Sequence, residues 1–380
     1  MSLDHNFPHL AIDRNTFSHA LEEGELDICL ECLHHDEIAG PEAAQLACRL
    51  AEKLFHAGRR GDAIECGRLA FAAANDQDTA RFCAWLFSNS GCYTDAAVAY
   101  ERLVERDPGW VEGYRHASGA FAAIGETERA IAFAIKASDQ APQDFDFAYH
   151  AGCLLLDAKR AEEAEFYLAR AVAIDLHNPG ALRALSAAAH LLDQQDEALS
   201  LALQAAALAP DDTDLAIHAS ELLLRSGRRN DAVALLDAAT GRDPADPRLW
   251  RLISAAESQQ DATDTALIAI ERALLLAPDN AEYHLHHGHL LYRAGDFTTA
   301  AEAINRAAAL DPTSQAMRRA QLDLLLAHGQ LAEATAIGGE LLRAFPEDEA
   351  AAEAVLHVLN RRLDTIDGDY VVLADDHGRR

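Results

Sequence analysis

Positive charge and aromatic side chains are scarce in this sequence. Its 380 residues include 32 Lys and Arg against 62 Asp and Glu, a formal net charge of −30, and only 6% are aromatic. Nucleic-acid binding depends on neutralising phosphates with Lys and Arg, so this charge argues against it. It argues equally against an anionic membrane surface. We expect protein or peptide partners, with basic segments favoured on the acidic exterior.

Long apolar runs are also lacking. No window approaches the roughly 18 uninterrupted apolar residues of a membrane span, so we expect no direct membrane insertion. The first residues, MSLDHNFPHLAIDRN, show no basic segment followed by an apolar run, which argues against a signal peptide. The seven cysteines all fall in the first 153 residues. An odd number of scattered cysteines predicts reduced thiols and a cytoplasmic protein.

Motifs of enzyme chemistry are absent as well. We find no nucleophile motif, no glycine-rich phosphate loop and no metalloprotease helix. Cys29 and Cys32 form a C-x-x-C, but a second cysteine pair at zinc spacing is missing. Ile28, Cys29, Cys32 and Leu33 make a helical apolar stripe, which favours core thiols. We therefore expect no enzyme, no cofactor and no bound metal.

A regular spacing of prolines is the main positive feature. They recur at one constant interval, with Leu176 at a single vacant position: Pro108, Pro142, Pro210, Pro244, Pro278, Pro312 and Pro346. Proline interrupts helices, and the Asp, Asn, Ser or Thr that follows suits a helix N-cap. Small residues keep the same period in two registers: Ala96, Ala130, Ala164, Ala198, Ala232, Ala266, Ala300 and Ala334, and Ala84, Ser118, Gly152, Ser186, Ser220, Ser254 and Gly288. Glycines suited to helix C-caps recur as Gly91, Gly125, Gly227, Gly295 and Gly329. Each interval thus predicts two helices.

These registers resemble the tetratricopeptide repeat family, whose units have about 34 residues, two helices and a closing proline. Tyr114 and Trp250 match the aromatic that often starts the motif. The resemblance implies an all-α, right-handed superhelix (α-solenoid) of about nine helix–turn–helix repeats, with a groove lined by the first helix of each. We expect an N-terminal helical pair or cap at 1–43, an array at 44–348, a capping helix at 349–363 and an acidic tail or linker at 364–380. The repeats within the array are 44–76, 77–110, 111–144, 145–178, 179–212, 213–246, 247–280, 281–314 and 315–348.

Four histidines stand close together at 284–289. On a helix, His284 and His287 share one face, expected to meet the core, while His286 and His289 share another, with His289 facing the groove and His286 its flank. The two pairs diverge, which favours packing and surface roles over a two-histidine metal site; a pH-sensitive face is the third possibility. His116, His150 and His218 occupy the same register as His286. Glu257 stands at an apolar register, with His287 as a conceivable partner or a loosely packed repeat as the alternative.

The groove registers hold the candidate partner-binding residues. Arginine recurs at one register, where it suits carboxylates or phosphates. The candidates are Arg81, Trp85, Asn89, Arg115, Tyr149, Arg183, Arg225, Arg248, Arg251, His289, Tyr292, Arg293 and Arg319. The alternative is a solvated face that is neutralised by local acids: Asp78, Glu112, Asp214, Glu221 and Glu282.

The resemblance implies a non-catalytic scaffold that binds proteins through the groove, including segments that carry acidic or carboxylate groups. Relatives that clamp chaperone C-termini use asparagine at a register that here holds Trp85, Gly119, Cys153, Ala187, Glu221, Ala255, His289 and Asp323. That role is therefore not expected. The alternative is a regulatory or docking part of bacterial surface-polysaccharide export or glycosyltransferase machinery, and a metal-binding or enzymatic protein comes third. The tail, 364–380, is a flexible end, a linker, or a segment that docks in the groove.

Overall fold

The structure, a computed structural model, describes residues 14–34, 41–259, 262–349, 352–353 and 355–356, and over these it is all-α, as predicted. It divides into two compact units, residues 1–201 (unit 1) and 202–380 (unit 2), a division that falls within helix α12.

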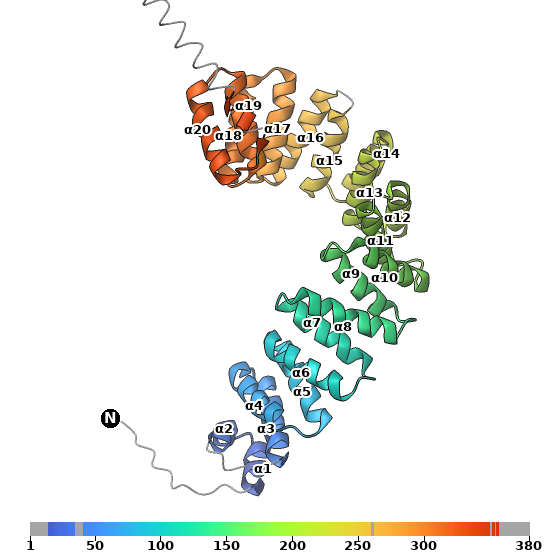
Figure 1. The fold of residues 1–380 in the computed structure, drawn as a ribbon, viewed down its shortest axis with the longest axis vertical. Coiled ribbons are helices and arrows are strands. Elements are labelled where there is room, and N and C mark those ends of the chain that lie inside the picture. Colours follow the sequence, from blue (N-terminus) through green and yellow to red (C-terminus); the bar gives the residue numbers. More distant parts are fainter. Residues whose placement is uncertain (1–13, 35–40, 260–261, 350–351, 354, 357–380) are drawn as a thin grey trace, which may run out of the picture. The chain divides into compact units, whose positions relative to one another are not determined.

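Helices follow one another in antiparallel pairs within each unit (Figure 1). We call the odd-numbered helix of a pair the first helix and the even-numbered one the second. The twenty helices of the described residues are α1 Arg14–Glu23, α2 Leu26–His34, α3 Pro41–His56, α4 Arg60–Ala73, α5 Gln77–Asn89, α6 Tyr93–Arg106, α7 Val111–Ala123, α8 Thr127–Gln140, α9 Phe145–Asp157, α10 Ala161–Ile174, α11 Pro179–Leu191, α12 Gln195–Leu208, α13 Thr213–Arg225, α14 Arg229–Arg242, α15 Pro247–Ser258, α16 Thr263–Leu276, α17 Ala281–Ala294, α18 Phe297–Leu310, α19 Gln315–Ala327 and α20 Leu331–Ala344.

The residues predicted to start and stop helices do so. Two residues after Pro278, Asn280 accepts a hydrogen bond from the Tyr283 backbone N–H at 3.1 Å, which satisfies one free donor of the first turn. The predicted C-cap glycines have φ between +71° and +86°, a region that costs L-residues energy. Lys159 (φ +59°) and Asp193 (φ +62°) occupy the same place in α9–α10 and α11–α12 without being glycine.

Small residues bring the helices of each pair together. All eight alanines of the predicted second-helix register are fully buried at 0% exposure. On the first helix, a Cβ built on Gly288 would lie 2.6 Å from Ile304 Cγ1 and 3.2 Å from the Ala300 carbonyl oxygen. Gly152 is equally tight against Leu168. These registers therefore hold small side chains because the facing helix leaves no room for larger ones.

One register fastens first helices to the loops that precede them. Trp250 Nε1 donates to the Pro244 carbonyl at 3.0 Å, and Arg318 Nε donates to the Pro312 carbonyl at 3.2 Å. His284 stands at the same register, with Nε2 at 2.8 Å from the Pro278 carbonyl oxygen. The expectation that His284 faces the core is therefore wrong, because its ring turns back to the junction between helix pairs.

The N-terminal core contains the C-x-x-C cysteines. Cys29 and Cys32 are buried with Phe17 and Leu21 of α1, as predicted for core thiols. Burial raises the pKa of Cys29 to about 11, so the thiol stays protonated at neutral pH. The predicted tail, 364–380, and most of the predicted capping helix, 349–363, lie outside the described residues. Among the described helices, none combines the length and the hydropathy that crossing a membrane requires.

Candidate functional site

The predicted partner-binding residues all come from first helices, α5 to α19. Six of them belong to unit 1 and seven to unit 2. Their surroundings differ strongly, although the registers are equivalent in sequence. Most of the arginines are already occupied by the chain's own acids or carbonyls, and a few are not.

In unit 1, Arg115, Tyr149 and Arg183 are the fifth residues of α7, α9 and α11. Arg115 and Tyr149 line a cavity of about 500 Å³, which also includes Asp146. Neither Arg115 nor Arg183 is in an ion pair with any described residue, and both are exposed. Tyr149 Oη lies 3.4 Å from where a Cβ of Gly180 would sit, so its hydroxyl reaches the first turn of α11, the helix that carries Arg183.

The other three unit 1 candidates are less available. Arg81 donates to Asp107 at 3.1 Å and lies over the Trp110 ring at 4.4 Å. Asn89 donates to the backbone carbonyl of Trp85 at 2.8 Å. Trp85 remains 43% exposed beside a ring partner, Phe55, at 5.4 Å. The tryptophan therefore presents an exposed aromatic surface.

In unit 2 the candidate arginines are largely neutralised, as the alternative of a solvated face expects. Arg248 pairs with both Asp214 and Asp246 at 2.7 Å. Arg251 pairs with Glu221 at 3.3 Å. The remaining three are Arg319, 3.6 Å from the buried Asp348; Arg293, which donates to the Ser258 carbonyl at 3.1 Å; and Arg225, exposed in the last turn of α13 without a described ion pair.

A second, smaller cavity lies among α17, α18 and α19 in unit 2. Its volume is about 220 Å³, and its wall includes His289, Tyr292 and Asp323. Burial lowers the pKa of His289, against the opposing effect of Asp323. Tyr292 is 41% exposed and meets the Phe297 ring edge-on at 5.1 Å. Because the rest of the wall is Ile304, Ala320 and Leu324, the cavity suits an apolar side chain with a polar end.

The four histidines of α17 lie in four different surroundings. Besides His284, His286 Nε2 lies 3.0 Å from Ser254 Oγ, and His287 Nε2 lies 3.9 Å from Glu271, while His289 faces its cavity. The described residues contain no cluster of three metal-binding side chains. The conceivable pairing of His287 with Glu257 is wrong, because Glu257 instead accepts a hydrogen bond from Thr265 Oγ1 at 3.0 Å.

Serine–histidine hydrogen bonds between successive first helices were not foreseen. Ser118 Oγ meets His150 Nε2 at 3.0 Å in unit 1, and Ser254 meets His286 at the same distance in unit 2. Ser254 Oγ also donates to the Ala266 carbonyl at 2.7 Å. A hydroxyl has one hydrogen, so Ser254 must accept from His286, which places a proton on Nε2. The available sequence signal was that serine precedes histidine by the same spacing in both pairs.

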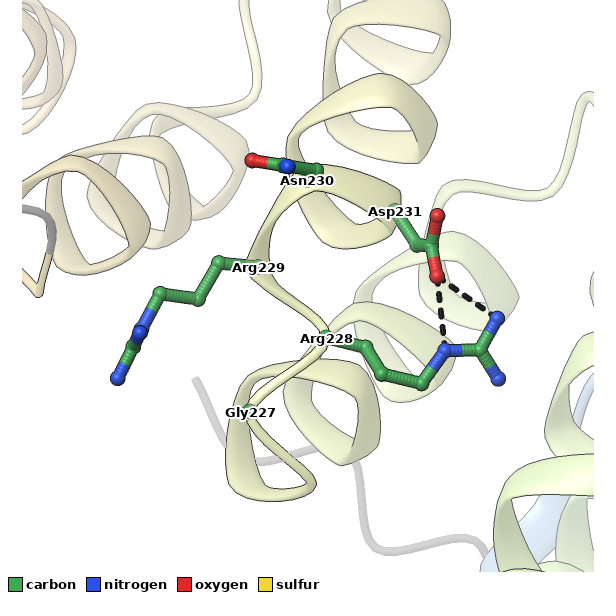
Figure 2. Close-up of a pocket in the computed structure, with 5 residues that line it drawn as sticks. All are labelled: Gly227, Arg228, Arg229, Asn230 and Asp231. Carbon is green, nitrogen blue, oxygen red and sulfur yellow. Dashed lines mark hydrogen bonds and ion pairs between the residues drawn. The ribbon is translucent and has the colours of Figure 1, made fainter.

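A third cavity, of about 440 Å³, surrounds the start of α14 and involves Gly227 to Asp231. Figure 2 shows that its polar side chains diverge: Arg228 turns to Asp231, and Arg229 points the other way. Arg228 pairs with Asp231 at 2.7 Å, and Arg229 Nε donates to Gln259 at 2.8 Å. Because no polar groups converge there, we do not consider it a ligand site.

Comparison with known proteins agrees with this architecture. Residues 189–256 and 285–349 each match a family model described as tetratricopeptide repeat. The chain thus contains tetratricopeptide repeats. The register of small residues, the glycine caps and the helix pairs are the features that this family shares.

Individual relatives are distant. A TPR repeat-containing protein of Treponema pallidum (strain Nichols) is 26% identical over 348 residues, covering 80% of this chain and 41% of that protein. The chain thus spans about two fifths of that relative's length. Yeast Tom70 superimposes with a TM-score of 0.54 at 14% identity, over 96% of this chain and 91% of Tom70. The Cut9–Hcn1 hetero-tetramer of the APC/C superimposes with a TM-score of 0.51 at 14% identity, over 90% of this chain and 82% of the matched chain. At these identities the likeness concerns the fold.

Proposed function

We propose that the chain is a non-catalytic scaffold that binds protein or peptide partners through its first helices. The main support is that exposed arginine side chains recur on first helices, Arg115 and Arg183 in unit 1 and Arg225 in unit 2, and that Trp85 and Tyr292 of first helices are exposed as well. Aromatic and arginine side chains are enriched where protein partners bind. The tetratricopeptide repeat family adds to this support, because stacked helical hairpins expose long binding surfaces.

We also propose the repeat boundaries, the class of partner and the cellular compartment. The segments predicted from 77 to 348 are the repeats, since α5 begins at 77, α7 at 111 and each later first helix follows at the same interval. Partners with carboxylate-bearing segments suit the arginines that lack an internal acid, and basic partners suit the net charge of −30. The compartment is the cytoplasm, in keeping with buried thiols such as Cys66, whose pKa burial raises to about 12.

Site-specific crosslinking tests the scaffold proposal. A photoreactive phenylalanine analogue replaces Trp85 or Tyr292 on first helices, and Phe166 or Leu275, which are 62% and 78% exposed, on second helices. After irradiation in a lysate of the source organism, we expect discrete crosslinked bands from the two first-helix positions and none from the second-helix positions. Equal labelling from both faces, or none from the first helices, would contradict the proposal.

A further inference from the structure

We infer that unit 1 binds an extended acidic peptide with two carboxylates about five to six residues apart. One carboxylate pairs with Arg115 and the other with Arg183, and the peptide passes over Tyr149, which lies between them. This rests on the proposed function and narrows it to a ligand chemistry. The three residues share one register on consecutive first helices, at the fifth position of α7, α9 and α11. They form what we call the two-arginine site.

Free charge distinguishes this site from the rest of the arginine register. Arg81, Arg251 and Arg319 stand at the same register and pair with Asp107, Glu221 and Asp348. Arg115 and Arg183 have no such partner among the described residues, in a chain with 62 acidic residues. An exposed guanidinium offers a planar fork of N–H donors, and it pairs best with a carboxylate.

The surroundings of both arginines are consistent with a bound peptide. The cavity beside Arg115 measures about 500 Å³ and offers hydroxyl groups from Ser88, Tyr93 and Tyr149. Burial and the neighbouring Cys153 raise the pKa of Tyr149, while the positive charge of Arg183 opposes that rise. The hydroxyls supply hydrogen bonds to a peptide backbone or to a carboxylate.

Helix geometry sets the spacing of the two carboxylates. Packed helix axes lie about 8–10 Å apart, so two steps from α7 to α11 span about 16–20 Å. The steps are direct contacts, since Ser118 of α7 meets His150 of α9 and Tyr149 of α9 reaches Gly180 of α11. An extended chain advances about 3.3 Å per residue, so this span corresponds to about five or six residues.

One acidic residue works against the site. Asp146 shares the cavity with Arg115 and is in no ion pair with a described residue. Its carboxylate repels an incoming acidic side chain. Removing the Asp146 charge should therefore strengthen peptide binding.

The test uses fluorescence anisotropy with labelled 12-residue peptides of Gly, Ser and Ala. One carries two Glu six positions apart, and a second of identical composition carries them adjacent. With the full chain we expect the spaced peptide to bind at least fivefold tighter than the adjacent one, with affinity falling as salt rises. Arg115→Gln and Arg183→Gln should each weaken it about fivefold or more, and Asp146→Asn should strengthen it.

The matched control is Arg251→Gln, which removes a register-equivalent arginine that Glu221 already neutralises. It should leave affinity unchanged, and circular dichroism should confirm that all variants are folded. Equal affinity for both spacings, no measurable binding, or equal losses in Arg251→Gln would overturn the inference. If peptides fail while crosslinks from Trp85 and Tyr292 succeed, the scaffold remains and the two-arginine site is refuted. If both fail, the proposed function fails as well.

Discussion

Protonation of His286 should loosen unit 2 at mildly acidic pH. Burial lowers the pKa of this histidine from its usual 6.5 to about 4, and the charges of Arg251, His289, His287 and Arg293 add to the effect. The neutral ring is thus favoured in the folded state, so the unfolded state binds more protons below pH 6.5. The stabilisation is fully present above about pH 6.5 and is lost as the pH falls toward 4.

The magnitude follows from the two pKa values. A shift of 6.5 to about 4 corresponds to about 3 kcal/mol once protonation is complete, at 1.36 kcal/mol per unit. At pH 5, linkage gives a loss of about 2 kcal/mol, or about 30-fold in the opening equilibrium. The loss should concentrate in α15 and α17, which the bond between Ser254 and His286 joins.

Hydrogen exchange measured by mass spectrometry at pH 7.5 and pH 5, corrected for intrinsic rates, provides the assay. His286→Gln keeps an N–H donor for Ser254 but does not titrate. Between pH 7.5 and pH 5, the protection factors of α15 and α17 should therefore fall about 30-fold in wild type but not in the variant. The control, His177→Gln, changes an exposed histidine of unit 1 and should match wild type. Identical protection losses in wild type and His286→Gln would refute the reasoning.

Three further predictions concern backbone strain, helix packing and a buried hydrogen bond, and urea unfolding measures the free energy of unfolding in each case. Lys159→Gly should stabilise by about 1 kcal/mol, because a lysine at φ +59° pays a steric cost that glycine avoids; a loss of stability would contradict this. Gly288→Ala should destabilise by about 1–3 kcal/mol through its contact with the facing helix, whereas Gly119→Ala, with open space around the new Cβ, should stabilise by about 0.5–1 kcal/mol. Ser118→Ala should cost about 1–3 kcal/mol because it leaves the His150 ring without its partner, and no change would show that the bond contributes nothing.

Much of the fold was predictable because its determinants are local. The proline interval, the alanine of the second helix and the C-cap glycines each act within a few residues of themselves, and each appears in the structure where the sequence placed it. His284 was misplaced because its partner, the Pro278 carbonyl, belongs to a loop whose path the helix period does not specify.

The candidate site was less predictable because neutralisation is decided between helix pairs. Arg81 takes Asp107, which follows it in the sequence, whereas Arg251 takes Glu221, which precedes it. Arginines at the same register therefore pair with acids that lie before them in the sequence in one case and after them in another. An acid-rich sequence contains many Asp and Glu residues that could serve as the partner. Only the structure separates Arg115 and Arg183 from the arginines that are already paired.

The serine–histidine bond shows why comparing equivalent positions missed a contact. Equivalent positions recur at the repeat interval, but this bond joins two different registers at a slightly shorter spacing. It also alternates. Ser220 is fully buried in α13, yet Leu252 stands where the histidine would be, and the Ser220 hydroxyl has no hydrogen-bond partner among the described residues. A buried hydroxyl without a partner costs stability, whereas the paired ones add it. Neighbouring interfaces in unit 2 therefore differ in strength. The α13–α15 interface should open before the α15–α17 interface. The order should reverse only at a pH low enough to protonate His286 and so weaken the α15–α17 interface.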